Sequence, residues 1–199
     1  MLFSAPFKKQ VETVLKNNKD NNALKATIFK ADISITDLDR NYFADHSLTI
    51  ARHPSESDQR MMLRVLAFIL NADEKLEFTK GLSEVEDPDI WLKDYSDQIL
   101  LWIELGTPSE QRVKKGCNQS RQMRVYAYAD NAFEEYLKKE QGKLAMKNNL
   151  EFFSFPNEVA EQLADIVERN MQIQITIQDG VVWFNIGEVT LEIVPSKRL

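Results

Sequence analysis

The stretch that most constrains the fold is an apolar run over residues 99–106, Ile-Leu-Leu-Trp-Ile-Glu-Leu-Gly, which leads directly into Thr107-Pro108-Ser109-Glu110. An unbroken apolar run of this length predicts a strand that is buried on both faces, in the middle of a sheet. The residues after it predict a helix start, because Thr107 can cap, Pro108 suits the first helical position and Glu110 completes a capping box. The chain is therefore organised around a central strand and the helix that follows it.

Glu104 is the only ionisable residue in this run, and it lies near the end of the predicted strand. A buried carboxylate must find a cation, hydrogen-bond donors or a proton, because burying it bare is prohibitive. In one interpretation, Glu104 pairs with an arginine such as Arg64 or Arg112 and holds the sheet to a helix. In the other, Glu104 and further carboxylates hold a hard divalent cation such as Mg²⁺.

The metal interpretation has a defined set of candidate residues. Glu56, expected in the first turn of the preceding helix, and Asp89 join Glu104 as candidate metal ligands. Lys114 and Lys115, one to two turns into the following helix, are the candidate catalytic cations. A bound metal can activate water and stabilise charge at a phosphate, while a nearby lysine can orient the nucleophile or neutralise the transition state. This set predicts metal-dependent chemistry on a phosphate.

Other kinds of catalytic or binding site lack the residues that they require. Cys117 is the single cysteine, so neither an internal disulfide nor a cysteine metal cluster can form. His46 and His53 are the only histidines, which excludes a multi-histidine metal site. Cys117 falls at an inward helical position, which favours a buried apolar role over a nucleophile. His53 precedes Pro54 at a helix start, which favours a local hydrogen bond over a general base.

Charge and hydropathy bound the partners and the compartment. The net charge of −6 argues against a generic nucleic-acid binder, because phosphate contacts need a positive surface. The exception is the helix region 110–124, where five positive charges stand against one negative charge, so nucleic acid is a candidate partner there. No apolar run is long enough to span a membrane, and the first residues do not form a secretory signal, so we expect no membrane partner and a cytoplasmic location.

Residue patterns along the chain predict one mixed α and β domain. Residues 28–36 alternate between apolar and polar, and residues 47–52 can return as a second strand, which makes an antiparallel hairpin. A helix capped by Ser55, a short strand over 75–79 and a helical turn over 88–93 follow. Strands and helices then alternate to Asp179-Gly180, the strongest hairpin signal of the chain. We expect an α/β domain over residues 23–199 with antiparallel hairpins at both ends, preceded by a loosely attached N-terminal extension over residues 1–22.

Several ordered blocks of the sequence resemble a known family. Among them are Ala-Leu-Lys-Ala-Thr-Ile-Phe-Lys-Ala (23–31), Asp-Leu-Asp-Arg-Asn (37–41), Ala-Arg-His-Pro-Ser-Glu (51–56), Phe-Thr-Lys-Gly-Leu (78–82), Leu-Trp-Ile-Glu-Leu-Gly (101–106) and Thr-Ile-Gln-Asp-Gly (176–180). Together they resemble the YaeQ family of small bacterial proteins, from about residue 23 to the C-terminus. The fold of that family resembles the PD-(D/E)xK nuclease core, a restriction-endonuclease-like sheet flanked by helices. The resemblance therefore implies a Mg²⁺-dependent phosphodiesterase or nuclease that acts on nucleic acid.

The resemblance also implies roles for individual residues. Glu104 would occupy the acidic strand position of the nuclease site, and Glu56 would be the helix carboxylate. Pro88-Asp89 supplies a literal Pro-Asp pair.

Two departures from the nuclease pattern point to an alternative function. The acid-x-lysine pattern requires a lysine where this chain has Gly106, so Lys114 or Lys115 would have to replace it. Close relatives carry an aspartate four residues before the glutamate, where this chain has Leu100. Because the loss of a carboxylate weakens Mg²⁺ binding, the alternative is a non-catalytic regulatory or binding module that retains the nuclease fold.

Overall fold

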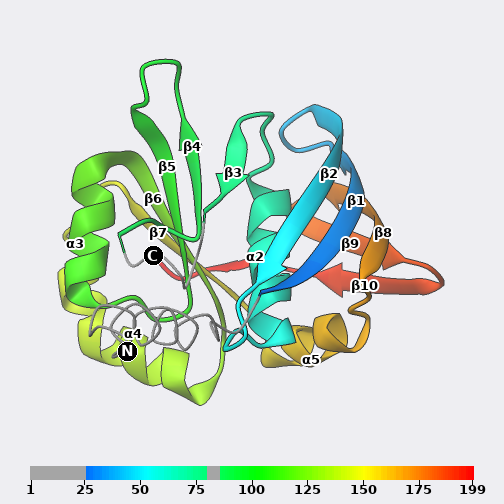
Figure 1. Cartoon of the computed structure of the whole chain (residues 1–199). Coiled ribbons are helices and arrows are strands. Elements are labelled where there is room, and N and C mark those ends of the chain that lie inside the picture. The colour runs from blue at the N-terminus through cyan, green and yellow to red at the C-terminus, as the bar shows by residue number, and fades with distance from the viewer. Residues whose placement is uncertain (1–25, 80–85) are drawn as a thin grey trace, which may run out of the picture.

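The computed structural model describes residues 26–79 and 86–199, which form two β-sheets and the helices between and beside them. Helix α2 (Asp58–Leu70) lies between the two sheets, and α3 and α4 cover the far face of one of them (Figure 1). The remaining helices have the following bounds: α3 (Glu110–Gln119), α4 (Asn131–Leu144) and α5 (Asn157–Asp165). The prediction of a mixed α and β fold is confirmed, whereas the predicted extension over residues 1–22 lies outside the described residues.

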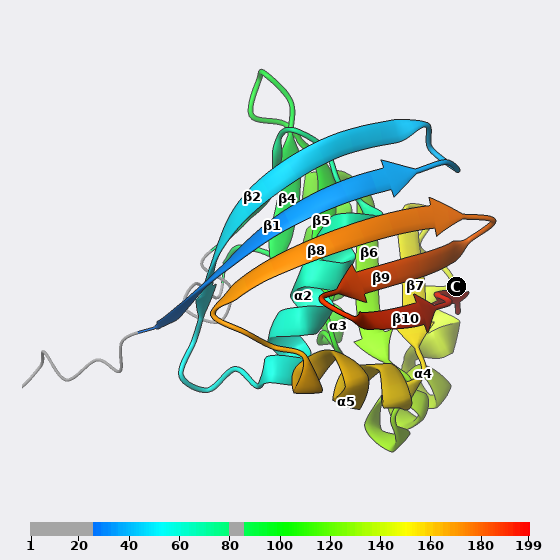
Figure 2. The same cartoon turned by 90° about the vertical axis from the view of Figure 1, so that its right-hand side faces the viewer.

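The first sheet has the strand order β10-β9-β8-β1-β2 and curves over α2 (Figure 2). Its first and last parts are the two predicted hairpins, joined in the middle because β8 pairs in parallel with β1. The alternation seen in the sequence places one face of the sheet in the core and the other in solvent. The strands are β1 (Thr27–Asp37), β2 (Tyr42–Arg52), β8 (Asn170–Gln178), β9 (Val181–Ile186) and β10 (Val189–Ile193).

The second sheet has the strand order β11-β7-β6-β5-β4-β3 and is built around the predicted central strand, β5. Strands β5, β6 and β7 run parallel, while β3, β4 and β11 pair antiparallel at the two sides. Leu101 and Ile103 of β5 pack in the core that contains α2, and Trp102 packs in a second core with α3 and α4. The strands are β3 (Leu76–Phe78), β4 (Ile90–Lys93), β5 (Ile99–Leu105), β6 (Ser120–Tyr128), β7 (Leu150–Phe155) and β11 (Ser196–Lys197).

Some predicted element boundaries are wrong. Residues 90–93 form strand β4 instead of a helical turn, because they pair antiparallel with β5. Helix α2 is capped by Ser57 instead of Ser55, and α3 by Ser109 instead of Thr107. In each helix the capping hydroxyl accepts the backbone N–H three residues on, which fixes the first turn. Among the described residues, no helix is both long and apolar enough to cross a membrane.

Candidate functional site

Glu56 is held between two arginines of α2. It lies directly before the capping residue Ser57, and thus outside the first helical turn where we expected it. Arg60 and Arg64 are one turn apart on α2, and both side chains point back toward Glu56. Glu56 Oε1 accepts from Arg60 Nη1 at 3.0 Å, and Glu56 Oε2 accepts from Arg64 Nη2 at 2.9 Å. Both carboxylate oxygens are therefore engaged in the buried space between α2 and the sheets.

Asp89 joins this cluster from the second sheet. It lies one residue before β4, and only 4% of its surface is exposed. Its Oδ1 accepts from Arg60 Nη2 at 2.6 Å, and its Oδ2 accepts from the backbone N–H of Leu105 at 3.0 Å. Arg60 thus bridges Glu56 and Asp89, which brings together two of the three carboxylates that the sequence singled out.

Glu104 lies on the other face of the sheet. Along β5 it shares a face with Trp102, which packs against α3 and α4, while α2 covers the opposite face. Glu104 Oε1 accepts from the indole Nε1 of Trp102 at 2.6 Å and from Arg112 Nε of α3 at 2.8 Å. Arg112 also donates to the backbone carbonyl of Asp87. Glu104 therefore joins the sheet to a helix through Arg112, as the first of our two interpretations proposed.

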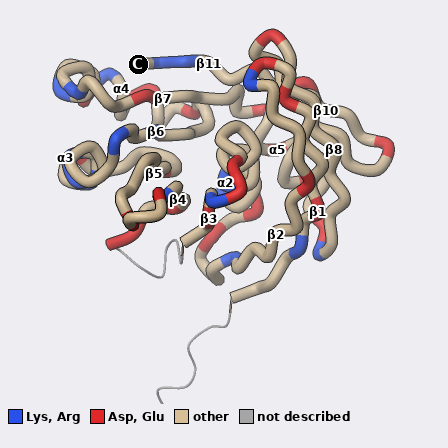
Figure 3. The backbone as a smooth tube through the Cα atoms, turned by 90° about the horizontal axis from the view of Figure 1, so that it is seen from above, with Lys and Arg blue, Asp and Glu red and all other residues tan. Residues whose placement is uncertain are grey.

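Burial and ion pairing act in opposite directions on the charged groups of this cluster. Burial raises the pKa of Glu104 above its ordinary value of 4.5, although Arg112 and Trp102 act in the opposite direction. Nearby Asp89 raises that pKa further, which shows that the two carboxylates interact despite their different surroundings. Burial lowers the pKa of Arg60, but Asp89 and Glu56 outweigh it, so the net shift is upward. The cluster thus contains three carboxylates and three guanidinium groups, and basic and acidic stretches of the backbone lie close together at α2 and β4 (Figure 3).

This arrangement does not fit a metal ion. Within residues 26–79 and 86–199, no three or more histidine, cysteine, aspartate or glutamate side chains are grouped so that they could hold one. The alternation of β5 explains why, since it places Glu104 on the face opposite α2 and Glu56. The binding of Mg²⁺ by this chain stays a prediction, which the grouping of the carboxylates does not support.

The two candidate lysines lie on α3, away from Glu56 and α2. Lys115 donates to the backbone carbonyl of Glu86 at 2.6 Å and also pairs with the carboxylate of Glu86. Its Nζ lies 5.8 Å from the centre of the Trp102 ring, on the face of β5 that carries Glu104. Lys114 is exposed to solvent. Three of the five basic residues of the predicted basic region are paired with carboxylates, Arg112 with Glu104, Lys115 with Glu86 and Arg124 with Glu151.

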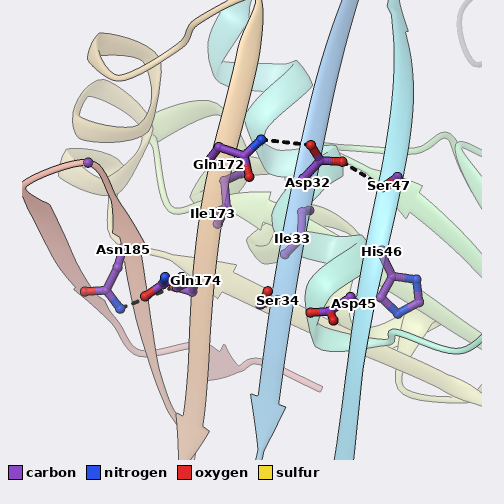
Figure 4. A pocket seen from close by; sticks show the side chains of 11 residues that line it. Asp32, Ile33, Ser34, Asp45, His46, Ser47, Gln172, Ile173, Gln174 and Asn185 are labelled. Carbon is purple, nitrogen blue, oxygen red and sulfur yellow. Dashed lines mark hydrogen bonds between the residues drawn. The ribbon is translucent and has the colours of Figure 1, made fainter.

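Two hollows lie near polar side chains. The first has a volume of about 260 Å³ and opens beyond the ends of β5 and β6, with Arg60, Thr107, Tyr128 and Asp130 in its lining. The second, of about 420 Å³, lies on the solvent face of the first sheet (Figure 4). There Asp32 accepts from Ser47 at 2.7 Å and from Gln172 at 2.8 Å, so that it joins three strands.

Sequence reasoning missed the two arginines that bridge the cluster from α2. From the sequence, Arg64 is only a candidate partner of Glu104, and Arg60 has no predicted role. Their spacing of four residues, with Glu56 four residues before Arg60, was a readable signal, because residues at this spacing lie on one face of a helix. The hydrogen bond between Trp102 and Glu104 was also predictable, because residues two apart in a strand share a face.

Comparisons with known proteins agree on one family. The family model described as YaeQ protein matches residues 22–195. Proteins named "Uncharacterized protein YaeQ" from Salmonella typhi and Escherichia coli (strain K12) are 46% and 44% identical over 171 residues, which cover 86% of this chain and 94% of each relative. The crystal structure of YaeQ protein from Xanthomonas axonopodis pv. citri matches with a TM-score of 0.84 and 42% identity, over 87% of this chain and 98% of the other. That of YaeQ protein from Pseudomonas syringae matches with a TM-score of 0.80 and 31% identity, over 87% and 96%.

Proposed function

The chain belongs to the YaeQ family, and from this premise we propose that it is a non-catalytic binding or regulatory module that retains a nuclease-like core. In this proposal, Glu56, Asp89 and Glu104 hold the two sheets and their helices together. The observation that carries the proposal is the engagement of these carboxylates by Arg60, Arg64 and Arg112.

The engaged oxygens leave little for a metal to bind. Both oxygens of Glu56 and both oxygens of Asp89 accept hydrogen bonds, and Glu104 Oε1 accepts two. A cation such as Mg²⁺ would have to displace Arg64, which is buried, or Arg60 and Arg112, which are half-buried. Leaving one buried charge without its partner costs about 3–5 kcal/mol, which the metal would have to supply in addition to its own dehydration.

The hollow beside Arg60 is the candidate ligand site of such a module. It lies beyond the carboxyl ends of the parallel strands β5 and β6, the place where open α/β sheets bind their ligands. Its lining includes the guanidinium of Arg60, the hydroxyls of Thr107 and Tyr128, and the carboxylate of Asp130. Tyr128 already donates to the carbonyl of Gln59, and Asp130 accepts from the backbone N–H of Phe133. Burial raises the pKa of Tyr128, so its hydroxyl is a neutral hydrogen-bonding group at physiological pH.

A second candidate function, a Mg²⁺-dependent phosphodiesterase acting on nucleic acid, is favoured by one observation. Glu56 and Asp89, chosen from the sequence as metal ligands, share the single side chain of Arg60. In this alternative, substrate phosphate would draw Arg60 away and leave two carboxylates for the metal. The predicted catalytic lysines, Lys114 and Lys115, lie on α3 away from this pair and would contact a more distant part of the nucleic acid.

A cleavage assay separates the two functions. The full chain is incubated with single- and double-stranded DNA and RNA in the presence of Mg²⁺ or Mn²⁺, beside the Glu56→Gln and Asp89→Asn variants. The binding-module proposal predicts no cleavage above that of the variants. Cleavage by the wild type that is lost in both folded variants would establish the phosphodiesterase instead.

A further inference from the structure

Strand β2 is an unusually open sheet edge. It lies at the end of the first sheet (Figure 2), and its eleven residues pair with β1 without any shift of register. The other strands at sheet ends are shorter, with five residues in β10, three in β3 and two in β11. Proteins protect long edges with charged side chains, proline or β-bulges; β2 contains neither proline nor a bulge, and its charged side chains are Asp45 and, at its end, Arg52.

The hydrogen bonds of β1 show which backbone groups of β2 face outward. Lys30 N donates to Arg169 O and Leu38 N donates to Ile177 O, so the even-numbered residues of β1 bond to β8. The odd-numbered residues of β1 therefore bond to β2, and their partners there are even-numbered. The N–H and C=O groups that point away from the sheet belong to Phe43, Asp45, Ser47, Thr49 and Ala51. Within the described part of the chain, Ala51 O accepts from Arg64 Nη2 at 3.1 Å, and the outward backbone groups of the other four have no protein partner.

We propose that two copies of this chain pair through β2, antiparallel about a two-fold axis at Ser47, and form one continuous ten-stranded sheet. This register sets Asp45 opposite Thr49 of the second copy and Phe43 opposite Ala51 of the second copy. In this register the odd-numbered residues of β2, whose backbone groups face outward, lie opposite one another in the two copies, so the ladder of hydrogen bonds can continue across the axis. At its ends, Ala51 O would accept from the second copy in addition to Arg64.

Exposed apolar residues support this register. Ile28 is 47% exposed and Phe43 is 58% exposed, and both side chains lie on the solvent face beside the β2 edge. Ile28 pairs with Ala51 at one end of the hairpin, and Phe43 lies near the other end. In the paired dimer, the Phe43 ring would lie over the small Ala51 side chain of the second copy and reach Ile28 beyond it. Because the dimer is two-fold symmetric, this contact occurs twice, and it covers Phe43 and Ile28 in each copy.

Charged residues select the same register. Asp45 would lie opposite Thr49 of the second copy, whose neighbour in the row is Lys30. Lys30 lies one strand beyond Thr49, where its long side chain can extend toward Asp45, so the attraction between the two charges favours this register, and it also occurs twice. With the axis shifted by one residue to His46, Asp45 would face Ser47, whose neighbour is Asp32, and like charges would disfavour that pairing. Asp45 lies on the solvent face close to Ser34 (Figure 4).

Sedimentation of the full chain tests the proposal with a matched pair of variants. Thr49→Pro removes an outward N–H without removing a bond to β1, and proline is tolerated at such an edge position. Thr49→Ala keeps this N–H. We expect the wild type and Thr49→Ala to dimerise with the same dissociation constant, and Thr49→Pro to dimerise at least about tenfold more weakly. Circular dichroism confirms that each variant is folded.

A charge exchange gives an independent readout. Asp45→Lys should weaken the dimer about tenfold, and the double variant Asp45→Lys/Lys30→Glu should restore most of the affinity, because the pair is re-formed with reversed signs. A wild type that sediments as a monomer at about 0.1 mM would overturn the proposal. It would equally be overturned by a dimer that neither Thr49→Pro nor Asp45→Lys weakens, since the copies would then meet through another surface.

Discussion

Replacement of Glu56 by glutamine should destabilise the fold strongly. The side chains of Glu56 and Arg64 are only 2% and 4% exposed, and their charged groups are 2.9 Å apart. In the variant, the guanidinium of Arg64 would keep the carbonyl of Ala51 as its acceptor but lose its counter-charge. Arg60 would be less affected, because it retains Asp89 and is 26% exposed.

The expected loss follows from the cost of an unpaired buried charge. Removal of one partner of a buried ion pair lowers the free energy of unfolding by about 3–5 kcal/mol. For a chain of this size, that loss corresponds to a decrease in Tm of about 6–20 °C. Urea unfolding followed by circular dichroism measures the free energy directly, provided that the transition is two-state.

A surface ion pair provides the control. Glu151 pairs with Arg124 and Lys197, and its side chain is 23% exposed, so Glu151→Gln should cost less than about 1 kcal/mol. The double variant Glu56→Gln/Arg64→Met should recover much of the loss, because the buried charge is gone. A cost for Glu56→Gln no larger than that for Glu151→Gln would refute the reasoning that the cluster holds the core together.

Three further predictions concern individual residues. Because burial raises the pKa of Glu104, the wild type should lose stability relative to Glu104→Gln as pH rises from 4.5 through the raised pKa of the folded state. A wild type that gains stability relative to the variant over this pH range would contradict this. Gly116→Ala should cost about 1–3 kcal/mol in urea unfolding, because its Cβ would come within 2.6 Å of Met123 Sδ, whereas Gly142→Ala meets no atom within 4 Å and should not destabilise. Cys117 is buried and its thiol pKa is raised, so Ellman's reagent should label it only on unfolding, and rapid labelling of the native protein would contradict the structure.

Local patterns were sufficient to predict much of the fold. The apolar run became β5, the alternation over residues 28–36 became β1, and Asp179-Gly180 became the turn between β8 and β9. In each case a short-range preference agrees with the burial that the tertiary structure imposes. Residues 90–93 form a strand and not the predicted helical turn, because their conformation is set by the long-range pairing with β5, which no local signal reports.

The candidate site was predictable in its members but not in its arrangement. Glu104 is buried, as the sequence predicts, and Arg112 is one of the two arginines named as its candidate partners; Glu56 and Asp89 are also buried, which the sequence does not predict. The face of β5 on which Glu104 lies depends on how the sheet packs between α2 and α3, which residue spacing does not determine. The joining of the two hairpins through β1 and β8, about 140 residues apart, was likewise beyond local patterns.

Calorimetric titration of Mn²⁺ and Mg²⁺ tests most directly whether arginines occupy the carboxylates. The metal is added to the wild-type chain and to Glu104→Gln and Asp89→Asn variants whose folding has been checked. Our account predicts no saturable binding in the wild type beyond the heat seen with the two variants. One-to-one binding in the wild type that either variant abolishes would contradict it and identify a metal site.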